Sequence, residues 1–249
     1  VGSPAQDQQV SFLMHHWQKN GTADVEPARD SSQNDPRTAK PPSMLIGSNM
    51  IHWYIWMGKG KPDVAARQSS NPEYWYTLHN SALWIQPELW THGNSLVRGD
   101  IQFYHKSKLV PGVETLPGFL HILDAWFEKF GGTSGGYTPQ QDRTVLESDD
   151  GFRLAPAICY ESIYGEHISR YFKKEANLMV IITNDGWWQN TSGHKQHWLY
   201  ARLRAIENRR WVARSANTGI SGFIDPMGNE VSPQPYDTEA CIRFAIPIQ

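Results

Sequence analysis

An uninterrupted apolar run, LMVIIT at Leu178–Thr183, limits the fold more than any other stretch of this 249-residue chain. A strand without polar alternation predicts burial on both faces, as in the central strands of α/β folds. The run is followed by NDGWW at residues 184–188. A loop at the carboxyl edge of such a strand is where these folds usually bind ligands. The pattern therefore predicts a central strand with a functional edge.

Strands and helices alternate in the second half of the chain, whereas the first half is typical of strands joined in hairpins. Further strands are expected over residues 44–48, 51–56, 76–85, 101–105, 143–147, 152–158, 211–215, 219–224 and 239–246. Helices are expected over residues 162–174 and 194–210, and a polar loop over residues 59–72. The strands at 76–85 and 101–105 predict a hairpin with a long connection. Together the elements predict a layered α/β or α+β domain.

The strand-like run LAPAICYE, residues 154–161, contains the candidate nucleophile Cys159. A helix that begins behind a thiol favours the thiolate and offers N–H groups to developing negative charge, so this position suits nucleophilic catalysis. The alternative is a small core residue, because free cysteine is often buried. Cys241 lies in an alternating run and is expected in the core. The sequence contains no C-x-x-C pair, so a zinc ribbon is excluded.

Three charged residues are candidates for assisting that thiol, which needs a base and a charge stabiliser. Lys106 directly follows a strand, and Glu114 comes after a Pro-Gly bend that could fold it back. A lysine beside a thiolate lowers the thiol pKa and can stabilise an oxyanion, although a strand-end lysine is often a solvated surface charge. Glu161 lies two residues after the cysteine, and its alternative role is interaction with a helix dipole.

Composition narrows the classes of partner. The net charge is -2 and there is no basic run, so nucleic acid is not an expected partner. The 11 Trp residues are a high count, and Trp favours interfaces such as a membrane surface or a lipid groove. Residues 116–130 are dense in large apolar side chains and predict either a buried helix or an arm that contacts lipid. The H-x-x-H pair His194 and His197 lacks a third ligand, so no metal is expected.

The N-terminal segment, residues 1–42, is the least informative. Its second half is rich in Asp, Ser, Pro and Asn, which predicts a loop. No apolar run approaches the roughly 20 residues of a membrane span, and no signal peptide is visible. Val1 is not an initiator Met, and the last expected strand runs to the terminus, so both ends are expected to be cut.

Four motifs together resemble the carbon–nitrogen hydrolase (nitrilase) superfamily. They are YHKSKLVPGVE at 104–114, ICYE at 158–161, NDGWW at 184–188 and ARLRAIENRRWVARSANTGISGFIDPMGNEV at 201–231. The LVPGVE part is similar to the branch that acylates bacterial lipoproteins and separates that branch from soluble amidases. The resemblance implies a four-layer αββα sandwich over residues 43–249, with residues 1–42 a divergent or incomplete N-terminal segment.

The resemblance also implies a Glu–Lys–Cys triad with Cys159 as nucleophile and Lys106 as the triad lysine. Glu114 falls on a second active-site glutamate, and Glu161 on the acid beside the nucleophile. Lys106 and the backbone N–H of Tyr160 would hold the oxyanion.

The family's general-base glutamate has no clear counterpart, because its W-P-E-x-A-like motif is missing from this sequence. Glu26, in the stretch DVEPA, lies in about the right region and is the candidate. Glu88 has the Pro-Glu dipeptide but follows a different strand.

The implied reaction is ping-pong and needs no cofactor. The thiolate takes an acyl chain from a phospholipid, and the resulting thioester passes it to the N-terminal amine of a diacylglyceryl-cysteine in an apolipoprotein. Because the family enzyme is an integral membrane protein, the chain is expected to be an excised extracytoplasmic (periplasmic) domain. Two alternatives stay open: a soluble nitrilase-type amidase that hydrolyses a small amide, and a catalytically dead lipid- or protein-binding domain.

Overall fold

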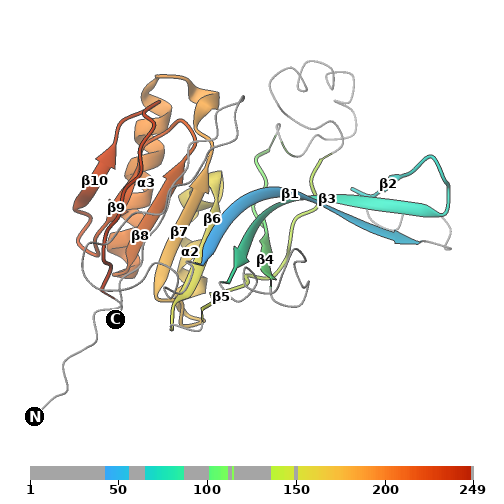
Figure 1. Ribbon diagram of the computed structural model, residues 1–249, viewed down its shortest axis with the longest axis horizontal. Coiled ribbons are helices and arrows are strands. Elements are labelled where there is room, and N and C mark those ends of the chain that lie inside the picture. The colour runs from blue at the N-terminus through green and yellow to red at the C-terminus, as the bar shows by residue number, and fades with distance from the viewer. Residues whose placement is uncertain are drawn as a thin grey trace, which may run out of the picture.

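The computed structural model describes residues 43–55, 65–86, 101–111, 114, 136–148 and 151–247. In this part of the chain two β-sheets pack on each other, and helices cover the outer face of the second sheet (Figure 1). The fold is therefore an α/β sandwich, as the sequence predicts. The segment 1–42 with Glu26, the apolar stretch 116–130 and Glu88 all lie outside the described residues.

The first sheet is antiparallel and is built on β3 (Tyr74–Ile85). β1 (Met44–Ile55) pairs with β3 along its whole length, while β2 (Arg67–Gln68) and β4 (Ile101–His105) pair with the other side of β3. β1 is one strand rather than the two expected pieces, because every residue in it faces a partner on β3. The expected pairing of β3 with β4 is confirmed. β2 falls within the stretch that was expected to be a polar loop.

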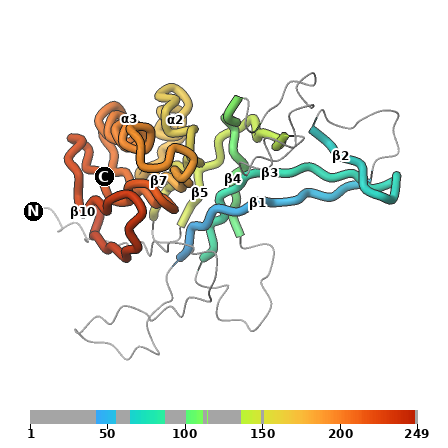
Figure 2. The backbone as a smooth tube through the Cα atoms, turned by 90° about the horizontal axis from the view of Figure 1, so that it is seen from above, coloured from blue at the N-terminus to red at the C-terminus, as the bar shows by residue number. Residues whose placement is uncertain are grey.

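The far end of the β1–β3 ladder extends away from the second sheet (Figures 1 and 2). On β1 it exposes Ile51, Trp53 and Ile55, with 53%, 52% and 59% of their surfaces accessible. The Trp53 ring packs on Tyr76 of β3, with ring centroids 4.8 Å apart. Alternate residues of a strand share one face. The ladder therefore presents an apolar face to solvent.

The second sheet contains six strands in the order β10-β9-β8-β7-β6-β5. They are β5 (Leu146–Glu147), β6 (Arg153–Ile158), β7 (Leu178–Thr183), β8 (Trp211–Ala216), β9 (Ser221–Ile224) and β10 (Glu230–Gln234). β6, β7 and β8 are parallel, and the other pairs are antiparallel. β7 is central, as its continuous apolar sequence predicts. Leu178 and Val180 join the core shared by the two sheets, whereas Met179 and Ile181 pack with the helices.

Two helices, α2 (Gly165–Phe172) and α3 (Ser192–Asn208), cover the outer face of the second sheet. α3 begins before its expected start because Thr191 caps it by accepting a hydrogen bond from the N–H of Gly193. Among the helices that the structure describes, none combines the length and the apolar content needed to cross a bilayer.

The chain after β6 differs from the expected single helix over residues 162–174. A short 3-10 turn, η4 (Cys159–Ile163), comes first, and α2 begins only at Gly165. The break lies at Tyr164, whose backbone is extended. The expectation that an α-helix begins directly behind Cys159 is therefore wrong. The stabilisation of the thiolate that was expected from an α-helix N-terminus is not supported.

The strand expected over residues 239–246 is also wrong, since these residues join no sheet. Both edges of β9 are already occupied by β8 and β10. The alternation in the sequence still reflects burial, because Ile242 is buried and Phe244 packs on Trp211 with ring centroids 5.2 Å apart. Cys241 has the opposite phase and is exposed, which contradicts its expected place in the core.

Candidate active site

Cys159 lies at a sharp turn between β6 and η4, at the carboxyl edge of the second sheet. Its backbone φ is +53°, in the left-handed region that residues with a side chain rarely adopt. Such a conformation costs about 1–3 kcal/mol and persists only where the surroundings hold it. The side chain is half-buried rather than sealed in the interior. The strained turn and the partial exposure favour a reactive thiol over a core residue.

Lys106 and Glu114 form a buried ion pair beside β4. The Lys106 ammonium donates to both carboxylate oxygens of Glu114, at 2.9 and 2.8 Å, and only 1% of Lys106 is exposed. The carboxylate also accepts the N–H of Val110 at 2.7 Å and the side-chain amide of Asn80 at 3.3 Å. Glu114 thus meets the lysine, as the sequence predicts. Lys106 is not the solvated surface charge of the alternative reading.

Glu161 joins the lysine loop to the cysteine turn. The carboxylate is fully buried, and its Oε1 accepts the N–H of Ser107 at 2.6 Å while its Oε2 accepts the N–H of Ile158 at 2.9 Å. Ser107 directly follows Lys106, and Ile158 directly precedes Cys159. One carboxylate therefore holds together the two segments that carry the candidate catalytic side chains.

Two more donors contact Glu161. The Tyr104 hydroxyl donates at 2.7 Å and the N–H of Lys108 at 2.9 Å. Burial raises the pKa of the Glu161 carboxyl, and the donated hydrogen bonds act in the opposite direction. Burial also raises the pKa of Tyr104, so its hydroxyl stays protonated and able to donate. These contacts indicate that Glu161 holds the Lys106 and Cys159 segments together. Glu161 also lies in the first turn of η4 and accepts the N–H of its N-cap residue, Ile158.

Tyr160 follows the cysteine within the η4 turn and is half-buried. Its ring meets Tyr164 edge to face, with ring centroids 5.8 Å apart. The contact fixes the side chain on the same short turn as Cys159. The role of its backbone N–H in holding an oxyanion stays a prediction.

A buried charged cluster of Asp185, His197 and Arg214 contacts the cysteine turn through His197. The sequence analysis did not predict this cluster. Asp185 binds Arg214 Nη2 through Oδ2 at 2.7 Å and His197 Nδ1 through Oδ1 at 2.9 Å. None of the three is more than 2% exposed. Gly219 packs so closely that a Cβ there would lie 2.2 Å from Asp185 Oδ2. The signal for this cluster was the aspartate of NDGWW at the edge of the central strand.

The two histidines considered as metal ligands have different partners. His194 Nε2 lies 3.3 Å from Asn190 Oδ1, and its ring packs on Tyr236 with centroids 4.5 Å apart. His197 belongs to the buried cluster with Asp185. Within the described residues, no three potential ligands lie close enough together to hold a metal ion.

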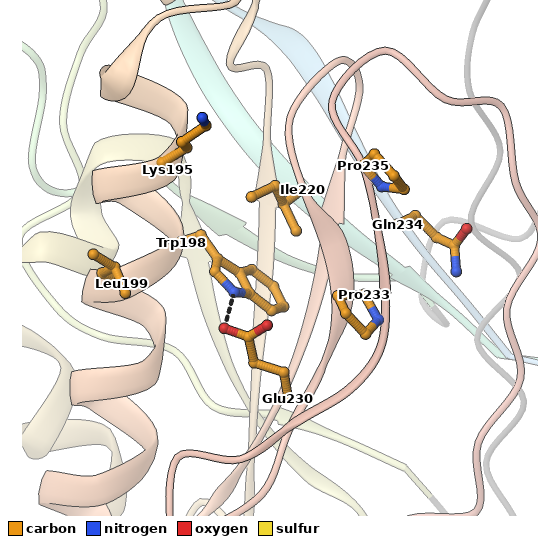
Figure 3. Close-up of a pocket in the computed structure, with 8 residues that line it drawn as sticks. All are labelled: Lys195, Trp198, Leu199, Ile220, Glu230, Pro233, Gln234 and Pro235. Atoms are coloured by element: carbon orange, nitrogen blue, oxygen red, sulfur yellow. Dashed lines mark hydrogen bonds between the residues drawn. The ribbon is translucent and has the colours of Figure 1, made fainter.

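A cavity of about 370 Å³ lies between α3 and β10 (Figure 3). Trp198 and Ile220 contribute to its lining, and the Trp198 indole donates to Glu230 at 2.8 Å. Neither Cys159 nor Lys106 lines it. This cavity is therefore separate from the candidate active site.

The buried cluster predicts a loss of stability in acid. Burial raises the pKa of Asp185, but hydrogen bonding to His197 and the charge of Arg214 outweigh it and lower the pKa from 3.8 to about 2. A carboxyl with a lowered folded-state pKa stabilises the fold above its unfolded pKa, and this contribution disappears as the pH falls from about 4 to about 2. The expected loss is about 2 kcal/mol.

Urea unfolding at several pH values between 5 and 2 would measure this loss. The matched control is Asp185→Asn, which lacks the titrating group and should be less stable than the wild-type chain at pH 5. The gap between the two proteins should narrow toward pH 2. A gap that stays constant over this range would contradict the assignment.

The carbon–nitrogen hydrolase family model matches residues 63–249. An apolipoprotein N-acyltransferase of Chlorobaculum tepidum is 32% identical over 181 residues, which cover 70% of this chain and 32% of that protein. An apolipoprotein N-acyltransferase of Rhizobium rhizogenes is 38% identical over 138 residues, which cover 55% of this chain and 26% of that protein. This chain thus spans about a third or less of the length of these two relatives. The structure of Saccharomyces cerevisiae Nit3, of the nitrilase superfamily, aligns with a TM-score of 0.49 at 18% identity, covering 73% of this chain and 57% of Nit3.

Proposed function

Because the chain belongs to the carbon–nitrogen hydrolase family, we propose that it carries the acyl-transfer site of a lipoprotein N-acyltransferase. Cys159 takes a fatty acyl chain from a phospholipid and passes it to the N-terminal amine of diacylglyceryl-cysteine in an apolipoprotein. The observation that carries this proposal is the Glu161 carboxylate, which ties the segment of the buried Lys106 to that of the half-buried Cys159. The named relatives support the choice of acceptor.

In the first half-reaction the thiolate of Cys159 attacks the ester carbonyl of the phospholipid. The carbon–oxygen bond to glycerol breaks, and the leaving oxygen takes up the proton that the thiol gave to a base. The Lys106 ammonium and the N–H of Tyr160 stabilise the negative charge of the tetrahedral intermediate. Glu114 keeps the lysine oriented, because it accepts hydrogen bonds from the ammonium through both carboxylate oxygens. Glu26 remains the candidate for the base.

In the second half-reaction the amine of the lipoprotein attacks the thioester. The carbon–sulfur bond breaks, the thiolate of Cys159 is restored, and the base accepts the proton that the amine loses. A thioester is reactive enough to acylate an amine without ATP, so the cycle needs no cofactor.

The exposed apolar face on β1 supports lipid as the donor. Ile51, Trp53 and Ile55 are each more than half exposed, and Trp favours the boundary between hydrocarbon and water. We propose that this face contacts the membrane, with the domain on the extracytoplasmic side where lipoproteins mature.

Intact mass after incubation with phosphatidylethanolamine vesicles tests the proposal. The expected product carries one fatty acyl group on Cys159 that hydroxylamine removes. A diacylglyceryl-cysteine peptide added afterwards should discharge it. A protein that stays unacylated with vesicles but hydrolyses small amides would be an amidase instead. A folded protein that does neither would be a binding domain.

A further inference from the structure

We propose that His197 is a positioning residue that fixes the backbone of the Cys159 turn through a hydrogen bond to the Cys159 carbonyl. This inference rests on the proposed role of Cys159 as the nucleophile. Glu161 holds the N-terminal side of the turn through the N–H of Ile158. His197 contacts the carbonyl of Cys159 itself, on the C-terminal side of that residue. The acyl-transfer steps above make no use of His197.

The contacts converge on one carbonyl oxygen. His197 Nε2 lies 3.1 Å from the Cys159 carbonyl and 2.8 Å from the Ser162 hydroxyl, and that hydroxyl donates to the same carbonyl at 3.0 Å. A carbonyl oxygen can only accept, so its contact with Nε2 places a ring proton on that nitrogen. The cysteine carbonyl thus receives hydrogen bonds from both side chains.

The need for such a hold follows from the backbone of Cys159. Its φ of +53° is a strained backbone conformation, which persists only where contacts from the surroundings hold it. Loss of the His197 donor leaves this carbonyl with the Ser162 hydroxyl as its side-chain donor, and the weaker hold favours relaxation of the turn toward the ordinary right-handed region. That change rotates the direction in which the cysteine side chain leaves the backbone, and a displacement of about 1 Å at a reacting atom costs about 100-fold in rate.

His197 is itself fixed by the rest of the buried cluster. Its Nδ1 lies 2.9 Å from Asp185 Oδ1 and 3.0 Å from Arg214 Nη2, so this nitrogen finds a partner in either protonation state. The Trp188 ring packs against the imidazole edge to face, with ring centroids 5.3 Å apart. The imidazole therefore has little freedom to turn away from the cysteine carbonyl.

Ser162, His197 and Asp185 have the order and spacing of a Ser–His–Asp triad, but burial excludes a serine nucleophile. Ser162 is 0% exposed, and its hydroxyl points at the Cys159 carbonyl. No substrate carbonyl reaches a hydroxyl in that position. The same chain of hydrogen bonds instead serves the neighbouring thiol by holding its backbone.

The rate of alkylation of Cys159 by iodoacetamide tests the inference, because it reports on the thiol without any acyl donor. The measurement uses a Cys241→Ser background, since Cys241 is exposed and would also react. His197→Ala should slow alkylation about 10- to 100-fold. His197→Gln, which returns a donor near Nε2, should recover a large part of the rate. Circular dichroism and a thermal melt establish that each variant is folded.

His194→Ala is the matched control, because His194 is a buried histidine on the same helix that contacts Asn190 and Tyr236. It should lose a comparable amount of stability and keep the wild-type alkylation rate. Wild-type alkylation in folded His197→Ala, or equal slowing in both histidine variants, would overturn the inference. Failure of vesicles to acylate the wild-type protein would count against the acyltransferase proposal alone, since alkylation does not depend on the acyl donor.

Discussion

Replacing Cys159 with alanine is expected to abolish acyl transfer, with a loss of at least about 10⁴-fold in rate. The sulfur forms the covalent bond that divides the reaction into two halves, and no neighbouring group in the described site substitutes for it. Because the side chain is half-buried and alanine keeps the backbone, the fold should persist. Acylation of the protein by radiolabelled phospholipid measures the first half, and transfer to a diacylglyceryl-cysteine peptide measures the whole.

The matched control is Cys241→Ala, which removes the other cysteine of the chain from an exposed position. It should keep full activity. Residual transfer by Cys159→Ala within about tenfold of the wild-type rate would mean that the reaction does not pass through this thiol.

The second large effect is expected from Lys106→Met, which removes a buried charge. Breaking a buried ion pair on one side leaves the other charge uncompensated and costs about 3–5 kcal/mol of folding stability. Loss of the ammonium also removes the group proposed to stabilise the oxyanion, which is worth about 10²–10³-fold in rate. Chemical denaturation gives the first quantity and single-turnover acylation of Cys159 gives the second.

A double variant separates stability from catalysis. Lys106→Met combined with Glu114→Leu replaces the buried pair by apolar side chains of similar size, so much of the lost stability should return. The acylation rate should stay at the level of the single variant, because the positive charge is still missing. Recovery of the rate along with the stability would show that Lys106 acts only through folding.

The sequence predicted the parts of the fold that depend on local pattern. The apolar run Leu178–Thr183 was expected at the centre of a sheet and lies there, because both of its faces are covered. Glu114 was expected to fold back beside Lys106, and the two side chains do meet. Both cases involve residues close in sequence, where local geometry leaves few possibilities.

Errors came where distant strands decide the outcome. Residues 239–246 alternate as a strand does, but they pair with no strand of either sheet. Cys241 was assigned to the wrong side of that alternation. The buried cluster was missed for a related reason, since Arg214 lies within β8 and meets Asp185 only when β7 and β8 pair. Besides the aspartate of NDGWW, a charged residue inside a largely apolar strand is a second signal that could have revealed it.

The hydrogen bonds of Glu161 have a consequence for how the two halves of the sandwich align. Apolar contacts between stacked sheets are non-directional and do not by themselves choose one sliding position over another. The Glu161 carboxylate is hydrogen-bonded to both layers. It accepts the N–H of Ser107, beyond the end of β4, and the N–H of Ile158, at the end of β6. The same atoms that prepare the chemistry thus set the registration of one sheet on the other.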